Sequence, residues 1–398
     1  MNAIADTKVS EIYCKSIISF KEIDDYKEDI LKLISSESEF DPNAHIEHIK
    51  SVVSNSPEII APFIIIGYKD DVPVSMLMSR IQKDTISINI GYKKLFTIKS
   101  LAMVFIYGGL VETLDEAWNN EINRLYVSEI MKMMRNLKVD NLKFNAMRVN
   151  SSLYKYLKSS PISRLYYYSK PGFHYKLRIP GSMEEYFKSK SKGIYKNHIY
   201  YEKKLNKAYK NINLYCFKIS DDVNKLLNDV EIIAKKTYQR GIGVGFEKNI
   251  LTEQRFMLAA EMGWLHSYVL YIDCKPVCFQ LGFLFKDGYF LQGKGFDPSF
   301  KDFRIGNYLF FKMLESLIGL KCVNFIDFGI GEADYKEMFC NERYLENTCI
   351  FFNYRMKSVI QFLACFISNN LNSLGKQILA RLRIEKRIKR NWRNLKEN

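Results

Sequence analysis

The chain has 398 residues and a formal net charge of +15, with 59 Lys and Arg against 44 Asp and Glu. Its hydrophobic fraction of 47% and aromatic fraction of 14% exclude a disordered chain and are typical of well-packed globular proteins. The length exceeds that of one ordinary core, so we expect two domains.

The excess positive charge is unevenly distributed along the chain. It concentrates in residues 188–210 and 376–396, whereas residues 1–170 are close to neutral. Such basic segments suit phosphorylated ligands, nucleic acid or an anionic membrane face. No RNA-binding signature or zinc-finger spacing accompanies them, which argues against nucleic acid.

The Cys and His patterns predict neither a disulfide framework nor a metal site. The 8 Cys are scattered without a Cys-x-x-Cys pair, and the 5 His show no metal-ligand spacing. Residues 1–13 lack an apolar core behind a basic start, and no run reaches the ~18 apolar residues of a membrane span. We therefore expect a cytoplasmic protein with reduced thiols.

The first half of the chain predicts helices, a strand hairpin, a long helix and a further strand. Helices are expected at 17–35 and 43–53, the second opened by Asp41-Pro42. The apolar runs 63–66 and 74–78 flank a turn and form a hairpin, which strand 86–90 extends; helix 118–137 and strand 139–147 follow.

The second half begins after Ser169-Lys170-Pro171-Gly172, which we take as the domain boundary. Residues 182–210 form a helical segment dense in Lys and Tyr, with Ser182 and Glu185 as a capping box. A helix at 222–236 follows, and strands 268–271 and 277–285 then flank a turn.

Short matches between the halves predict a duplicated domain. Pro73-Val74 and Lys83-Asp84 both recur at an offset of 203 residues, as Pro276-Val277 and Lys286-Asp287. The position that corresponds to Asp327 is close to Phe144, and the glycines that follow Asp327 have no counterpart. The second copy is therefore the better candidate for an active site.

Residues 288–339 are the most informative part of the sequence. They predict a strand, a charged loop, an amphipathic helix, a second strand, a glycine turn and a short helix. Such a strand–helix–strand unit makes a right-handed crossover between two parallel strands. Ligands bind beyond the carboxyl ends of parallel strands, where the amides of the helix start are unpaired. Here those ends carry residues 303–306 and 327–331, so we place the chemistry there.

Two groups of residues at these ends are candidates for direct roles. Gly306, between Ile305 and Asn307, would open a helix whose free amides hold a pyrophosphate, with Arg304 pairing the phosphates. The alternatives are an ordinary loop glycine and a solvated surface charge. Asp327 ends a buried strand, where an ionised carboxylate is costly unless paired, so it is either catalytic or a cap for the next turn.

The sequence resembles the CelD-like acetyltransferases of the FemAB-like branch of the GNAT superfamily over about residues 171–354. Five marks carry the resemblance: the basic helix 188–210, Thr237-Tyr238-Gln239, Lys275-Pro276-Val277, Phe296-Asp297-Pro298 ahead of Gly306, and Asp327-Phe328-Gly329-x-Gly331 followed by Tyr335-Lys336.

The resemblance implies an α/β fold with two tandem GNAT-like domains, each a mixed sheet flanked by helices, and a basic C-terminal helical tail. The domains would be a degenerate one at 1–170, a catalytic one at 171–355 and the tail at 356–398. The implied activity is acyl transfer from acetyl-CoA, without a metal, to an amine or hydroxyl of a sugar or envelope-polysaccharide precursor. The alternatives are a FemAB-like peptidyltransferase that uses aminoacyl-tRNA and a non-catalytic scaffold of envelope glycan assembly.

Further site residues follow from the resemblance. Tyr335 would be the general acid, and Lys336 would orient an acceptor phosphate or pair with Asp327. Tyr238 and Gln239 would line the acceptor pocket. The glycines of the strand end would contact substrate, namely Gly329 and Gly331.

The C-terminal segment predicts a basic amphipathic helix. Five apolar residues share one face, surrounded by Arg and Lys, and they are Ile378, Leu382, Ile388, Trp392 and Leu395. Such a helix binds an anionic membrane surface, here the inner face of the cell membrane, or docks on the protein's own body or on a partner.

Overall fold

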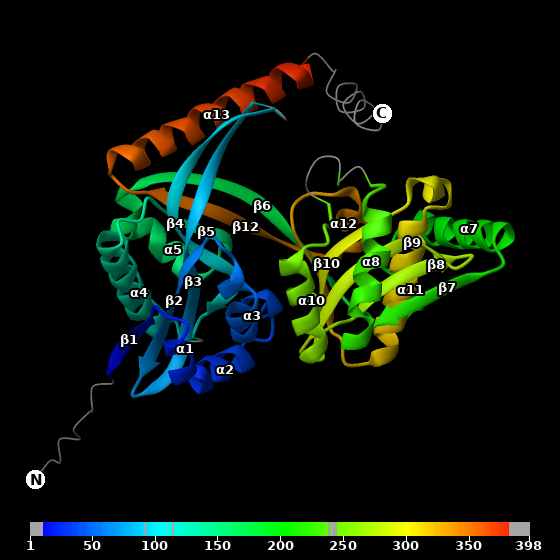
Figure 1. Cartoon of the computed structure of the whole chain (residues 1–398), viewed down its shortest axis with the longest axis horizontal. Helices are drawn as coiled ribbons and strands as arrows, with labels where there is room; N and C mark the ends of the chain where they lie inside the picture. Colours follow the sequence, from blue (N-terminus) through cyan, green and yellow to red (C-terminus); the bar gives the residue numbers. More distant parts are fainter. Residues whose placement is uncertain (1–10, 91–92, 114, 238–239, 241–244, 382–398) are drawn as a thin grey trace, which may run out of the picture. The chain divides into compact units, whose positions relative to one another are not determined.

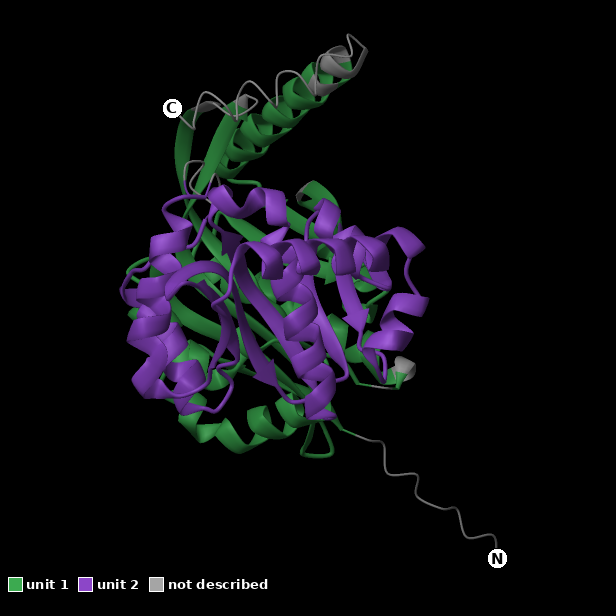
Figure 2. Cartoon of the chain, turned by 90° about the vertical axis from the view of Figure 1, so that its right-hand side faces the viewer, with its two compact units in different colours: residues 1–172, 345–378 green, residues 173–344, 379–398 purple. Residues whose placement is uncertain are grey.

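The computed structural model describes the chain apart from residues 1–10, 91–92, 114, 238–239, 241–244 and 382–398 (Figure 1). The chain divides into two compact units (Figure 2). Unit 1 comprises residues 1–172 and 345–378, and unit 2 comprises 173–344 and 379–398. Each unit is α/β, with its own buried hydrophobic core.

Unit 1 is a mixed six-stranded sheet with helices packed against it. Its strands are adjacent in the order β1 (Ile12–Ile17), β2 (Ile59–Lys69), β3 (Val72–Ile90), β4 (Lys93–Val111), β5 (Asn141–Arg148) and β12 (Glu342–Phe352). Neighbouring strands are antiparallel except β4 and β5, which are parallel. The helical elements are α1 (Glu22–Asp25), α2 (Lys27–Ser36), η1 (Pro42–Ala44), α3 (Ile46–Ser51), η2 (Val53–Asn55), α4 (Glu116–Asn136), α5 (Ser152–Ser159), η3 (Pro161–Arg164) and most of α13 (Met356–Arg381).

Unit 2 repeats this arrangement. Its strands are adjacent in the order β7 (Ile212–Phe217), β8 (Ser267–Ile272), β9 (Lys275–Phe285), β10 (Gly288–Phe296), β11 (Phe325–Ile330) and β6 (Tyr166–Arg178). The one parallel pair, β10 with β11, again joins the fourth and fifth strands. The helical elements are α6 (Met183–Lys188), α7 (Lys192–Ala208), η4 (Ser220–Asp222), α8 (Val223–Ala234), α10 (Ile250–Glu261), η5 (Pro298–Phe303), α11 (Ile305–Leu320) and α12 (Asp334–Phe339).

The sixth strand of each unit comes from an unexpected part of the chain. Strand β12, next to β5, follows strands β6 to β11 in sequence, whereas β6, next to β11, precedes the other strands of unit 2. Residues 169–172, which we took as the domain boundary, lie inside β6, and the first segment of unit 1 ends at Gly172. Residues 345–355, expected in the second domain, are grouped with unit 1.

The repeated turns explain why the two units share a local plan. The β2–β3 turn places Asp70 and Asp71 at φ 48° and 63°, and the β8–β9 turn places Asp273 and Cys274 at 49° and 63°. Two-residue hairpin turns need positive φ at both positions, which Asp tolerates better than most residues. These turns lie at the same offset of 203 residues that the sequence comparison found.

Several predicted elements are confirmed and others differ. The hairpins, the long helix α4, strand β5 and the parallel β10–α11–β11 unit are present as expected. The helix expected from residue 17 begins later, because β1 extends to Ile17. The segment 182–210 divides into α6 and α7; Ser182 caps α6 by accepting from the Glu185 amide at 3.2 Å.

Within the described part of the chain, no helix is both long enough and apolar enough to cross a membrane.

Candidate active site

The parallel strands β10 and β11 separate at their carboxyl ends. Their pairing ends at Phe290 and Asp327, although β10 continues to Phe296 and β11 to Ile330. Register shifts coincide with the separation, between residues 291 and 293 of β10 and between 327 and 329 of β11. Bulges of this kind bend strands and redirect their side chains. The opening lies at the carboxyl ends of the parallel strands, which is where α/β sheets bind ligands. We call it the strand opening.

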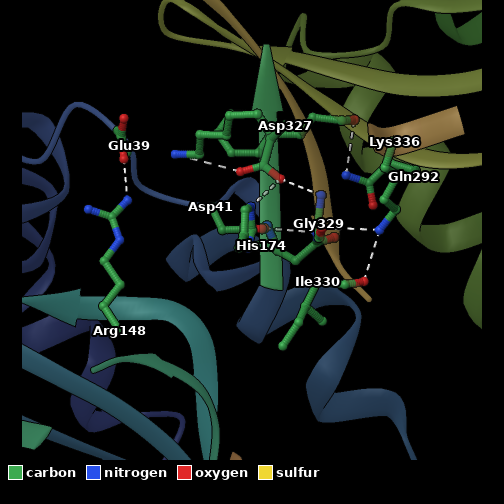
Figure 3. A network of polar contacts seen from close by, with 12 residues as sticks. Glu39, Asp41, Arg148, His174, Gln292, Asp327, Gly329, Ile330 and Lys336 are labelled. Atoms are coloured by element: carbon green, nitrogen blue, oxygen red, sulfur yellow. Dashed lines mark hydrogen bonds and ion pairs between the residues drawn. The ribbon is translucent and has the colours of Figure 1, made fainter. Parts of the chain in front are cut away.

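Asp327 is the centre of a buried polar cluster at the strand opening (Figure 3). Its Oδ1 atom accepts a hydrogen bond from the Gly329 amide at 2.7 Å and lies 2.8 Å from His174 Nε2. Its Oδ2 atom lies 3.7 Å from Lys176 Nζ. His174 is fully buried and stacks on Tyr344, with ring centroids 4.9 Å apart.

These contacts explain the charge state of Asp327. Burial alone would raise the pKa of its carboxyl, but the hydrogen bond with His174 and the charges of His174 and Lys176 hold that pKa below its usual value. The bond from Gly329 also fixes the bulge, where Gly329 adopts φ 69°. The geometry therefore favours a positioning role for Asp327.

Lys336 reaches the same turn from α12. Its Nζ donates to the carbonyl oxygens of Gly329 at 3.0 Å and Ile330 at 2.9 Å. Burial lowers the pKa of this ammonium, and Asp327 partly offsets the shift. Gly331, at φ 103°, donates from its amide to the Phe173 carbonyl at 3.0 Å. The predicted residues of β11 and α12 are thus brought together around one turn.

Lys294 is a site residue that the sequence analysis missed. It lies on β10 within the strand opening, and its Nζ is 2.8 Å from the centroid of the Tyr335 ring. Burial lowers the pKa of Lys294 to about 7; the Cys278 thiol opposes this shift and the Lys336 charge favours it. With a pKa near 7, Lys294 can exchange a proton near neutral pH, as an acid–base group must. The sequence feature that could have revealed this residue is a lysine between two glycines in a mostly apolar strand.

The start of α11 offers backbone amides beside the opening. The first amides of a helix have no intrahelical partner and attract anions. Ile305 is fully buried in the core of unit 2, whereas the next residue, Gly306, is only partly buried. A Cβ on Gly306 would lie 3.6 Å from Phe296 Cδ1, an ordinary contact, so packing by itself does not require glycine there. Arg304, at φ 48°, is exposed and lies 5.2 Å over the Tyr201 ring.

Helix α7 lies against this helix start. Arg304, Asn307 and Met338 line a small pocket with residues of α7. Lys204 Nζ donates to the Asp302 carbonyl at 3.1 Å. A larger cavity of about 820 Å³ lies between α6, α7 and α11, away from the strand opening. Its lysines are Lys188, Lys190, Lys192, Lys196 and Lys312.

Two predicted substrate contacts, Tyr238 and Gln239, lie outside the described residues. So does the last part of the predicted basic tail, residues 382–398. Within the described ranges, no group of three or more His, Cys, Asp or Glu side chains could hold a metal ion.

Unit 1 has a different chemistry at the corresponding place. The residue that corresponds to Asp327 is Phe144, which is buried and stacks on Phe105 with ring centroids 3.9 Å apart. The bend itself is kept, because Ala146 adopts φ 47°. The segment that leads into α4 carries Glu112 and Asp115, which would repel a phosphate.

Comparisons with known proteins identify the second unit. Residues 195–337 match the family model described as an acetyltransferase (GNAT) domain. This part of the chain is similar to GNAT acetyltransferase domains. It includes the strand opening, α11 and most of α12. A search of curated proteins found no match.

Solved structures agree on the fold. The structure titled FemX is similar over 87% of this chain and 100% of its own, with 10% identity and a TM-score of 0.58. A conserved protein of unknown function from Bacteroides thetaiotaomicron is similar over 86% and 100%, with 11% identity and a TM-score of 0.51. The chain therefore shares its fold with these structures. Because unit 1 repeats the arrangement of unit 2, which carries the matched acetyltransferase (GNAT) domain, the two units are tandem GNAT-like domains, and that domain makes the chain an acyltransferase.

We predict that Asp327→Asn destabilises the GNAT domain. The substitution removes the negative charge that His174 and Lys176 share at Asp327, and breaking a buried pair costs about 3–5 kcal/mol. The free energy of unfolding at pH 7, from denaturant titration, should fall accordingly. The exposed Asp221→Asn is the control and should be neutral within ~0.5 kcal/mol. Equal stability of the two variants would contradict the structural role of the cluster.

We also predict a pH-dependent stability effect for Lys294→Met. Because the folded pKa of Lys294 is about 7, below its unfolded value, the unfolded chain binds more protons between these pH values. The parent's stability should therefore rise with pH above 7 through this group. The variant lacks this dependence, so its melting temperature relative to the parent should be higher at pH 7 than at pH 9.5. A difference that does not change with pH would exclude the shifted lysine.

Proposed function

We propose that the protein transfers an acetyl group from acetyl-CoA to an amine or hydroxyl of a sugar or envelope-polysaccharide precursor in the cytoplasm. The observation that carries the proposal is the helix start at Gly306, next to a strand opening that contains Lys294 and Tyr335. The resemblance to CelD-like proteins supports the acceptor class.

The amides of Ile305 and Gly306 would hold the pyrophosphate of the donor, and Arg304 and Asn307 would pair with its oxygens. The thioester would then extend into the strand opening. Helix-start amides bind a pyrophosphate best when no side chain stands between them and the ligand, which is the role of Gly306. The turn at Gly329 and Gly331 would contact the acceptor.

The proposed transfer needs one proton acceptor and one proton donor. Lys294, neutral above pH 7, takes the proton of the acceptor as its nitrogen or oxygen forms a bond with the thioester carbonyl carbon. The carbon–sulfur bond then breaks, and Tyr335 gives its proton to the departing thiolate. Lys294 Nζ lies over the face of the Tyr335 ring, so the two groups stay close. The proton that Lys294 took from the acceptor then returns to the Tyr335 oxygen through solvent, which restores the site.

Asp327 and Lys336 would act through the backbone. Asp327 fixes the Gly329 bulge, and Lys336 holds the carbonyls of the same turn. Their positive neighbour Lys176 and the lysines of the opening also favour the negative charge that develops on the carbonyl oxygen. Both residues are therefore proposed as positioning residues.

We predict that Gly306→Val weakens binding of the donor. Its branched side chain would stand over the helix-start amides, and the Kd for CoA by calorimetry should rise about tenfold or more, which is ~1.4 kcal/mol. Gly319→Val is the matched control, since it lies on the same helix with nothing within 4 Å of the added Cβ. Both variants should melt near the parent's temperature. Unchanged CoA affinity in Gly306→Val would remove the donor from this helix start.

We predict that Lys294→Met lowers kcat/KM by about 10²–10⁴-fold and changes its pH profile. The parent should lose activity as pH falls below about 7, because Lys294 becomes protonated. The variant should lack this limb and regain part of its rate with added small primary amines. The exposed Lys275→Met serves as the control. Retention of the acidic limb in Lys294→Met would assign it to another group.

One observation favours a second candidate function, FemAB-like transfer from aminoacyl-tRNA. The lysine-rich helix α7 lies against the helix start that would hold the donor. Basic residues along one helix suit an RNA backbone. Transfer assays with acetyl-CoA and with aminoacyl-tRNA, each at two salt concentrations, separate the two functions, because only RNA binding should weaken steeply with salt.

A further inference from the structure

Helix α13 carries its apolar residues on the face that points away from the protein. Seven large apolar side chains, spaced mostly three or four residues apart, are each between 46% and 78% exposed. They are Met356, Ile360, Leu363, Phe366, Ile367, Leu371 and Leu374. We call them the α13 stripe. At 1.5 Å per residue it extends over about 27 Å. Contiguous exposed apolar surface of this kind marks an interaction site.

The covered face of α13 is mostly polar, although half-buried Phe362 also packs there against Phe352. The helix runs along the long hairpin of β3 and β4 (Figure 1). Gln361 Nε2 donates to the Lys99 carbonyl at 3.3 Å, and Ser368 Oγ and Asn372 Nδ2 donate to the Asn89 carbonyl at 2.7 and 2.8 Å. These bonds fix the rotation of the helix within unit 1. A surface helix normally buries its apolar face, so this inversion leaves the stripe available to a partner.

The charges along the C-terminal sequence identify the kind of partner. Residues 358–375 contain no Lys, Arg, Asp or Glu, whereas residues 376–396 contain nine Lys and Arg and one Glu. An apolar face followed by a dense positive segment matches a lipid bilayer with anionic headgroups. In a paired coiled coil, charges beside the seam select the partner, and the stripe has none. A second copy would also bring two basic segments together.

We propose that α13 lays its stripe on the surface of an anionic bilayer, to which the positive charge of the sequence after residue 375 attracts it. This inference goes beyond the proposed acyl transfer and does not depend on it. The sequence predicted membrane binding by the tail. The proposal assigns this binding to α13, whose orientation is fixed by its hydrogen bonds to the β3–β4 hairpin. The helix would lie in the interface plane, where apolar burial and charge attraction add together.

Vesicle flotation of the full chain tests the proposal. The parent should bind phosphatidylcholine vesicles that contain 30% phosphatidylglycerol, and bind pure phosphatidylcholine at least tenfold more weakly. Replacing Ile360, Ile367 and Leu371 by Ser should reduce binding to the anionic vesicles about tenfold or more. The matched control replaces the exposed Ile219, Ile232 and Ile250 of unit 2 by Ser and should bind like the parent. Acyl transfer to a soluble acceptor should be unchanged in both variants.

Three results would overturn the proposal. The first is a parent that ignores anionic vesicles at low salt, or a stripe variant that binds as well as the parent. The second is a parent dimer, by light scattering, that the stripe variant converts to a monomer without any vesicle binding, which would assign the stripe to a second copy. The third is stronger binding after removal of residues 382–398, which would show that the tail covers the stripe. Weaker binding after this removal is the expected outcome, because part of the attracting positive charge is lost.

Discussion

The buried carboxylate of Asp327 is the interaction on which the candidate site depends. An ionised group in this position is tolerated only because His174, Lys176 and the Gly329 amide surround it. The same contacts hold β6 against the bulge of β11 and fix the turn that receives Lys336. The opening between β10 and β11 is therefore maintained by a buried electrostatic cluster whose charges stabilise one another.

The two units show how one backbone plan supports two roles. Both keep the separation of the fourth and fifth strands and a residue with positive φ after the bend, Ala146 in one and Gly329 in the other. Unit 1 fills the position of the carboxylate with Phe144, whose stacking stabilises the core by apolar burial alone. Unit 2 has buried charges in this position, which stabilise the core less than apolar packing does. Burial shifts the pKa values of such groups, and shifted pKa values make proton transfer possible.

Lys294 on β10 and Lys336 on α12 both lie at the strand opening, and the pKa of each ammonium is below its usual value. Lys294 and Lys336 each lose water on burial, and the charge of Lys336 also disfavours a charge on Lys294. In the proposed transfer, a neutral Lys294 would accept a proton, and Lys336 would favour the negative charge that develops on the carbonyl oxygen. The α13 stripe is a separate feature of unit 1 that would bring the enzyme to a surface.

The sequence alone determined the local elements and the chemistry at the strand end. Turns at Asp70-Asp71 and Asp273-Cys274, the order β10–α11–β11 and the carboxylate followed by glycines depend on residues close in the chain, so periodicity and turn propensity predict them. Only the tertiary structure decided the positions of β6 and β12, because strand pairing between distant segments leaves no local signal. The tertiary structure also decided the pKa of Lys294, because elements distant in sequence bury this side chain. It likewise decided which face of α13 is covered, because hydropathy predicts an amphipathic helix but not its orientation.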